Sequence, residues 1–176
     1  MPKTYSKEET DHSIDVNDIN IHYNEAGSGP ALICTHGGGP GANAWDNTKL
    51  ALPYLAEHFR TILLDMPGFG GSQKQISRNG VPMDLFCATL QRDFMDRLGI
   101  DKAHLYGSSA FGGAALRFGI EFPDRIGKII IQALRGRRPQ RDRGPEIAGH
   151  LRSKSRAREH GGDDAPFHPA RRVPHA

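Results

Sequence analysis

The sequence predicts an α/β fold with a mostly parallel β-sheet, flanking helices and an N-terminal β-hairpin. Short continuous apolar runs, which suit strands covered on both faces, occur at residues 31–35, 61–65 and 126–132. Segments with helical periodicity lie between these runs, and turns rich in Gly and Pro follow the first two. Strands that alternate with helices in this way form a layered structure in which helices cover a parallel sheet.

The hairpin is predicted from residues 13–16 and 19–25, which alternate between apolar and polar side chains. Asn17 and Asp18 lie between them and have the side chains that favour a tight turn. Residues 1–12 are polar and charged, so we expect a loose N-terminal arm ahead of the hairpin.

Three segments are predicted to be helical. Residues 45–57 have apolar residues at helical spacing, with a break or restart at Pro53. A second helix is predicted over residues 84–98, with Asp84 as its N-cap. The third follows a strand and covers residues 109–122.

The start of this third helix is the most informative stretch of the chain. Residues 104–113 read HLYGSSAFGG, the pattern of a strand, a sharp turn and a helix. A serine at the tip of such a turn has its hydroxyl lifted clear of the sheet, close to the free N–H groups of the helix N-terminus. Ser109 is therefore a candidate nucleophile; the alternative is an ordinary polar turn with a serine cap.

A glycine-rich run, HGGGPG at residues 36–41, follows the first buried strand. It lacks the Lys-Ser/Thr of a P-loop and the spacing of a dinucleotide fingerprint, so no cofactor is expected. Consecutive glycines can instead point backbone N–H groups at a ligand, although a flexible loop is the alternative. Because the carboxyl ends of parallel strands share one edge, we expect this run to lie near Ser109.

A second turn, DMPGFGGS at residues 65–72, follows the next buried strand. Asp65 is a possible catalytic acid by residue type. We expect it instead to fix the turn through hydrogen bonds to backbone N–H groups.

Composition divides the 176 residues into two parts. Up to Ala133 there are 12 Lys and Arg against 15 Asp and Glu, whereas residues 134–176 have 11 Lys and Arg against 5 Asp and Glu.

Cys34 and Cys87 lie in apolar patterns without disulfide or metal spacing, and we expect them to be small core residues. With no signal peptide and no apolar run long enough for a membrane span, a soluble cytoplasmic protein is expected.

These motifs together resemble the α/β-hydrolase superfamily. Within it, the run from His36 to Ala42 followed by Trp45-Asp46-Asn47, and the segment FPDRIGK at residues 122–128, resemble the meta-cleavage product hydrolases. The resemblance covers residues 14–133. It implies hydrolysis of a carbon–carbon bond in the dienoate ring-fission products of aromatic degradation, a small-molecule substrate, and no partnership with nucleic acid or membrane. Homo-oligomers occur in that family, but none is expected for this chain.

The resemblance also implies roles for individual residues. Ser109 takes the position of the nucleophile, and the oxyanion hole would be formed by N–H groups of Gly38 or Gly39 and of Ala110. Asn47 matches a polar substrate contact. Ser108 stands where those enzymes often have a substrate-holding asparagine.

Besides Ser108, two features depart from the family pattern. The elbow pattern Gly-x-Ser-x-Gly ends here in Phe111, which would either distort the turn or be accommodated by rotation. The second departure is the segment 134–176, whose ten Arg and five Pro predict a basic, disordered tail. We therefore expect a partial hydrolase core over residues 13–133.

The tail leaves the acid and histidine of a catalytic triad unidentified. Asp163 or Asp164 with His168 or His175 are candidates, without a strand-end pattern around them. One interpretation of the tail is an arm for nucleic acid or anionic surfaces, and the favoured one is a frameshifted extension. The functional alternatives are accordingly a general ester hydrolase on the same scaffold, or a catalytically dead fragment that only binds ligands or partners.

Overall fold

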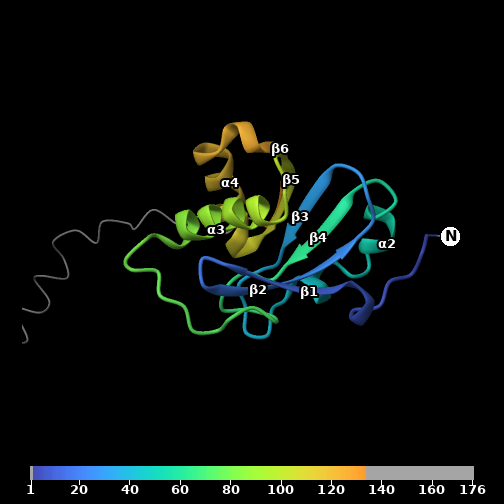
Figure 1. The fold of residues 1–176 in the computed structure, drawn as a ribbon, viewed down its shortest axis with the longest axis horizontal. Coiled ribbons are helices and arrows are strands. Elements are labelled where there is room, and N and C mark those ends of the chain that lie inside the picture. Colours follow the sequence, from blue (N-terminus) through green and yellow to red (C-terminus); the bar gives the residue numbers. More distant parts are fainter. Residues whose placement is uncertain (1, 134–176) are drawn as a thin grey trace, which may run out of the picture. The chain divides into compact units, whose positions relative to one another are not determined.

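The computed structural model describes residues 2–133, which form one mixed sheet of six strands in the order β1-β2-β4-β3-β5-β6 (Figure 1). The pairs β3–β4, β3–β5 and β5–β6 are parallel, and β2 joins β1 and β4 antiparallel. The strands are β1 (Asp11–Val16), β2 (Ile19–Ala26), β3 (Ala31–Thr35), β4 (Arg60–Leu64), β5 (Ala103–Ser108) and β6 (Ile126–Gln132). The helices are α1 (Ala44–Thr48), α2 (Leu52–Leu55), α3 (Met83–Arg97) and α4 (Gly112–Glu121).

Helices cover both faces of the sheet, which confirms the predicted fold class. Successive residues of a strand point to opposite faces, and β3 follows this rule: Ile33 packs with α3 and α4, whereas Leu32 and Cys34 pack with α1 and α2. The larger core lies on the α3 and α4 side and includes the fully buried Phe94 and Phe118. Burial of these apolar surfaces is the main force that holds the layers together.

The N-terminal hairpin forms as predicted. Asn17 and Asp18 have φ values of 51° and 62°, and the tight hairpin turn needs positive φ at both positions. More of the preceding arm is ordered than the sequence predicts. Residues Glu8–Thr10 form a short 3₁₀ helix, and the Asn24 side chain donates to the Lys7 carbonyl at 3.0 Å.

Two helix boundaries differ from the sequence prediction. Asp84 lies inside the first turn of α3, and Pro82 occupies the N-cap position without a side-chain hydrogen bond. The region 45–57 forms two short helices, α1 and α2. Pro53 lies in the first turn of α2, where its missing N–H removes no intrahelical bond, so it starts a helix rather than breaking one.

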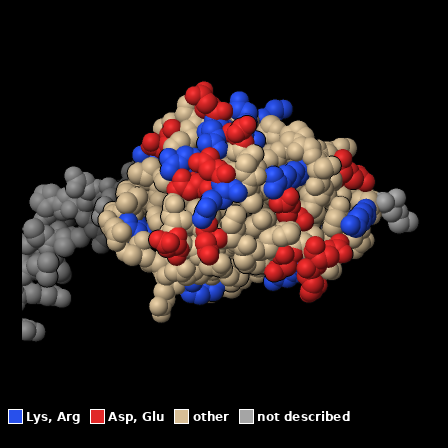
Figure 2. Space-filling view, viewed as in Figure 1, with Lys and Arg blue, Asp and Glu red and all other residues tan. Residues whose placement is uncertain are grey.

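Strand β6 is an edge strand within residues 2–133, and its Ile130 is 54% exposed. Acidic and basic side chains are interspersed over the face seen in Figure 2. Among the described residues, no helix has the length and apolarity needed to cross a membrane.

The two cysteines of residues 2–133, Cys34 and Cys87, are free and buried. Burial raises the pKa of each thiol to about 12, as suits the predicted core residues.

Candidate active site

Ser109 lies at a strained turn between β5 and α4. Its φ is 47°, a left-handed conformation that a non-glycine residue adopts at a cost of roughly 1–3 kcal/mol. Ser109–Phe111 form one 3₁₀ turn before α4 begins. The turn is tight, because a Cβ added to Gly107 would lie 2.8 Å from the Gly112 Cα. The backbone therefore adopts the sharp strand-to-helix turn that the sequence predicts.

The glycine-rich run lies directly beside this turn. Strands β3 and β5 are parallel neighbours with Thr35 opposite Gly107, so the segments that follow them leave the sheet together. A Cβ built on Gly38 would lie 2.7 Å from the Ala110 Cβ, and one on Gly37 would lie 3.6 Å from the Ser109 Cβ. The structure thus brings Gly37 and Gly38 against the serine turn.

Gly39 stands further out. A Cβ built on it would meet no heavy atom of the described part of the chain within 4 Å. Of the two glycines proposed for the oxyanion hole, the geometry therefore favours Gly38, whose neighbour Ala110 is the other proposed donor.

His36 fixes the start of the glycine run. Its Nδ1–H donates to the Gly37 carbonyl at 2.7 Å, and its Nε2 accepts from the Met66 N–H at 3.1 Å. This pattern requires a neutral ring, and burial lowers the His36 pKa accordingly. His36 is consequently a structural residue that ties β3 to the end of β4, without a free nitrogen to act as a base.

Phe111, which stands at the last glycine position of the elbow pattern, is accommodated in an aromatic cluster. It is 4% exposed and packs edge-on against His36 and Phe69, with ring centroids 5.1 and 5.4 Å away. Ser109 keeps its left-handed φ, so the large side chain coexists with the elbow. The cluster links the turn after β5 to the turn after β4.

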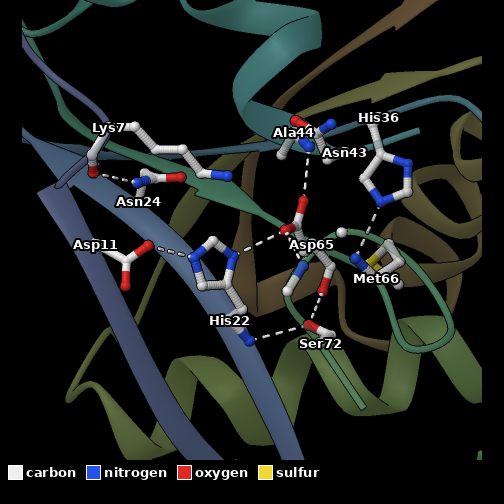
Figure 3. A network of polar contacts seen from close by, with 12 residues as sticks. Lys7, Asp11, His22, Asn24, His36, Asn43, Ala44, Asp65, Met66 and Ser72 are labelled. Carbon is white, nitrogen blue, oxygen red and sulfur yellow. Dashed lines mark hydrogen bonds and ion pairs between the residues drawn. The ribbon is translucent and has the colours of Figure 1, made fainter. Parts of the chain in front are cut away.

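Asp65 is the centre of a buried hydrogen-bond network (Figure 3). One carboxylate oxygen accepts from the Ala44 N–H at 2.6 Å, and the other accepts from the Gly71 N–H and from His22 Nδ1, each at 2.8 Å. The carboxylate occupies the space that a side chain at Gly70 would need. As the sequence predicts, Asp65 fixes its own turn; it also holds the start of α1.

His22 bridges two carboxylates, a contact that the sequence does not reveal. Its Nε2 lies 2.7 Å from Asp11 Oδ1 on β1, opposite its bond to Asp65. The hydrogen bond to Asp65 raises the His22 pKa, burial lowers it, and Asp11 raises it further, so that it lies above 6.5. Burial raises the Asp65 pKa, but the bonds from His22, Ala44 and Gly71 outweigh burial and hold it below 3.8.

These pKa shifts predict how stability depends on pH. The contribution of His22 to the free energy of unfolding is complete below pH 6.5 and is lost as the pH rises through its raised pKa. The contribution of Asp65 to the same free energy is present above pH 3.8 and is lost as the pH falls through its lowered pKa. Urea unfolding between pH 6 and 9 should therefore show a declining free energy of unfolding. His22→Gln should flatten this decline, and the matched change at exposed His58 should leave it in place. An unchanged decline in the His22 variant would contradict the assignment.

No histidine within residues 2–133 is hydrogen-bonded to Ser109. The described histidines either hold other partners or lie elsewhere on the fold: His12, His22, His36, His58 and His104. The triad candidates of the sequence, Asp163, Asp164, His168 and His175, lie outside the described residues, as does the entire predicted tail.

Among residues 2–133, no three His, Cys, Asp or Glu side chains converge on a metal position.

Asn47 on α1, a predicted substrate contact, lines a pocket of about 300 Å³ together with Tyr106 of β5. Burial raises the pKa of the Tyr106 phenol, whose hydroxyl is hydrogen-bonded to Gln132. The other predicted substrate contact is Ser108 on β5. Ser108 also faces the glycine run, since a Cβ on Gly37 would lie 3.9 Å from its Oγ. Sequence reasoning missed Tyr106, although strand alternation places it on the same face of β5 as Ser108.

The fold, the elbow and the glycine loop define an α/β hydrolase. Residues 30–151 match the sequence profile of the alpha/beta hydrolase fold, and the chain belongs to this family. It is 45% identical over 118 residues to 2-hydroxy-6-oxo-6-phenylhexa-2,4-dienoate hydrolase of Comamonas testosteroni, covering 66% of this chain and 41% of that protein. The enzyme of the same name from Burkholderia cepacia is 44% identical over 133 residues, with 73% and 44% covered.

A solved structure agrees with this family assignment. The 2-hydroxy-6-oxo-6-phenylhexa-2,4-dienoate hydrolase from Rhodococcus sp. strain RHA1 superposes with a TM-score of 0.64 at 30% identity, covering 83% of this chain and 54% of that one. The chain spans about two fifths of the length of the curated relatives described above.

Proposed function

We propose that the chain is the N-terminal part of a serine-dependent hydrolase that cleaves carbon–carbon bonds in meta-cleavage products of aromatic degradation. One observation carries the proposal: a strained serine, Ser109, lies against Gly37, and the next residue, Ala110, lies against Gly38. The similarity to dienoate hydrolases supports the substrate class. We further propose a small-molecule substrate and a cytoplasmic location.

The proposed reaction uses the elbow as follows. After the dienol substrate is ketonised, the Ser109 Oγ attacks the carbonyl carbon at the scissile bond, and its proton passes to a base. The N–H groups of Gly38 and Ala110 stabilise the resulting oxyanion, a contribution of about 3–4 kcal/mol for a well-placed donor. The carbon–carbon bond then breaks, the leaving carbon departs as a stabilised carbanion and is protonated, and water hydrolyses the acyl-enzyme.

A pocket beside the glycine loop favours an anionic substrate. Its volume is about 620 Å³, and it is lined by the loop from Gly38 to Asn43, by residues 68–70 and by Lys7 and Lys74. Two lysines that line the same pocket as Gly38 would attract a carboxylate such as that of a dienoate. A neutral ester gains nothing from these charges, so the pocket favours the dienoate over the ester alternative.

We expect little turnover from this chain, because no base is hydrogen-bonded to Ser109 within residues 2–133 and a serine hydroxyl alone is a weak nucleophile. The frameshift interpretation of residues 134–176 can be tested on the coding DNA. Translation of the other two frames beyond the Ala133 codon should continue with strands, an Asp and then a His. If neither frame does so, the frameshift interpretation is wrong.

The function itself is tested by comparing two substrates. We expect 2-hydroxy-6-oxo-6-phenylhexa-2,4-dienoate to be consumed slowly, with p-nitrophenyl acetate consumed less efficiently relative to its uncatalysed rate, and Ser109→Ala to remove both activities. Loss of the dienoate absorbance and release of p-nitrophenolate report the two reactions. A preference for the ester would favour a general ester hydrolase. Equal rates for the unmodified chain and Ser109→Ala would indicate a dead fragment.

A further inference from the structure

Strand β6 is open along its outer side. It ends the sheet formed by residues 2–133, and within that range only β5 pairs with it (Figure 1). The Lys128 N–H is directed at His104 of β5, so strand alternation turns the backbone groups of Ile129 and Ile131 away from β5. A strand edge that presents N–H and C=O groups in this way is a template for pairing with another strand.

Apolar side chains flank this edge on both faces of the sheet. On the α1 and α2 face, Ile130 is 54% exposed and lines the pocket of about 300 Å³. On the other face α4 packs on β6, since a Cβ added to Gly119 would lie 2.8 Å from the Ile129 Cδ1. Leu116 and Ile120 of α4 are 40% and 71% exposed. Exposed apolar surface gathered around an open strand edge indicates an interface.

The opposite edge of the sheet is protected by charge. Strand β1 includes Asp11, His12 and Asp15, and four of its six residues are exposed. Strand β6 has one charged residue, Lys128, among seven. Because charged side chains on an edge strand oppose pairing with another chain, β6 rather than β1 is the edge suited to association.

The chain offers one strand that matches this edge, which is β6 itself. The sequence that follows Ala133 contains ten Arg and five Pro, and its large apolar residues occur singly, so it predicts no apolar strand to cover β6. A second copy of β6 brings the same isoleucines and the same outward backbone groups. An interface that one strand makes with its own copy is closed by a two-fold axis, which limits the assembly to a dimer.

We propose that two copies of the chain associate through β6, which pairs antiparallel with its counterpart about Ile129. In this register the backbone groups of Ile129 bond to those of the second Ile129, and those of Ile131 bond to Gly127 of the second copy. Each Ile130 lies directly opposite Lys128 of the second copy, so no two lysines face each other. This dimer replaces the sequence expectation of no homo-oligomer, and it does not depend on the proposed reaction.

The first test is the assembly state of the full 176-residue chain, measured by sedimentation velocity over a series of concentrations. We expect an equilibrium between monomer and dimer. Ile130→Lys should raise the dimer dissociation constant about tenfold, because it places lysines opposite each other at two symmetry-related positions. The matched variant Val81→Lys adds the same charge at an exposed position that lines a pocket with Asn17 of the hairpin, and it should associate like the unmodified chain. A monomer at every concentration, or equal effects of the two variants, would overturn the proposal.

The second test is charge reversal, which examines the register. In the double variant Lys128→Glu with Ile130→Lys, each lysine lies opposite a glutamate of the second copy, so most of the affinity lost in Ile130→Lys should return. Circular dichroism establishes that both variants are folded. A folded double variant that associates as weakly as Ile130→Lys would contradict this pairing.

The third test requires no substitution. Amide hydrogen exchange of Ile129 and Ile131 in the unmodified chain should slow as the chain concentration rises, because dimer formation covers these N–H groups. Protection that is the same at all concentrations would mean that the edge is covered within one copy, and exchange that is fast at all concentrations would mean that it stays open. Either result would overturn the proposal.

Discussion

Asp65→Ala is expected to lower the free energy of unfolding by about 3–5 kcal/mol, the loss typical of breaking a buried charged pair. Asp65 is 3% exposed and accepts hydrogen bonds from two backbone N–H groups and from His22. Its removal leaves these donors buried without an acceptor, and the protonated His22 ring keeps only Asp11. Urea unfolding at pH 6, where both partners are charged, measures the effect directly.

The control for this prediction is another aspartate of the chain. Asp46 has a side chain 61% exposed and pairs with Lys49 at 2.7 Å. Surface pairs of this kind contribute roughly 0–1 kcal/mol, so Asp46→Ala should unfold almost like the unmodified chain. A similar small loss in Asp65→Ala would mean that the network in Figure 3 does not stabilise the fold.

Gly38→Val is expected to slow fluorophosphonate labelling of Ser109 by about 10²–10³-fold, the effect of losing one oxyanion donor. A Cβ at Gly38 would lie only 2.7 Å from the Ala110 Cβ, so a branched side chain must push the loop away from the serine turn. The backbone N–H moves with it, and the developing negative charge loses its donor. Rates are measured by mass spectrometry of the intact chain over time.

The matched control is a glycine without this contact. A Cβ added to Gly113 in α4 meets no heavy atom of the described chain within 4 Å, so Gly113→Ala should label like the unmodified chain. If Gly38→Val labels at the unmodified rate while remaining folded by circular dichroism, the glycine loop is not part of the oxyanion site.

The parts of the fold that follow from local chemistry could be predicted from the sequence. Residues 126–132 are an apolar run and form β6, and Asn17-Asp18 forms the hairpin turn because its residue types tolerate positive φ. The meeting of Ser109 with the glycine run was predictable for a general reason, since parallel strands end at one edge of the sheet.

The contacts that depend on strand order could not be predicted. His22 reaches Asp65 only because β2 pairs with β4, and no local pattern specifies that neighbour. The contact of Phe111 with His36 likewise requires β3 and β5 to be adjacent. The hydrogen bond of Tyr106 could not be predicted either. Its aromatic side chain is typical of a strand, but only the register of β6 against β5 places Gln132 at its hydroxyl.

The central claim is that the Ser109 hydroxyl, at a strained turn facing the glycine loop, is the reactive group of this chain. The most direct measurement is the site of modification after prolonged incubation with a fluorophosphonate, located by peptide mass spectrometry. The account predicts slow modification confined to Ser109, with the adjacent Ser108 unmodified. Modification spread over other serines, or its absence from Ser109, would contradict it.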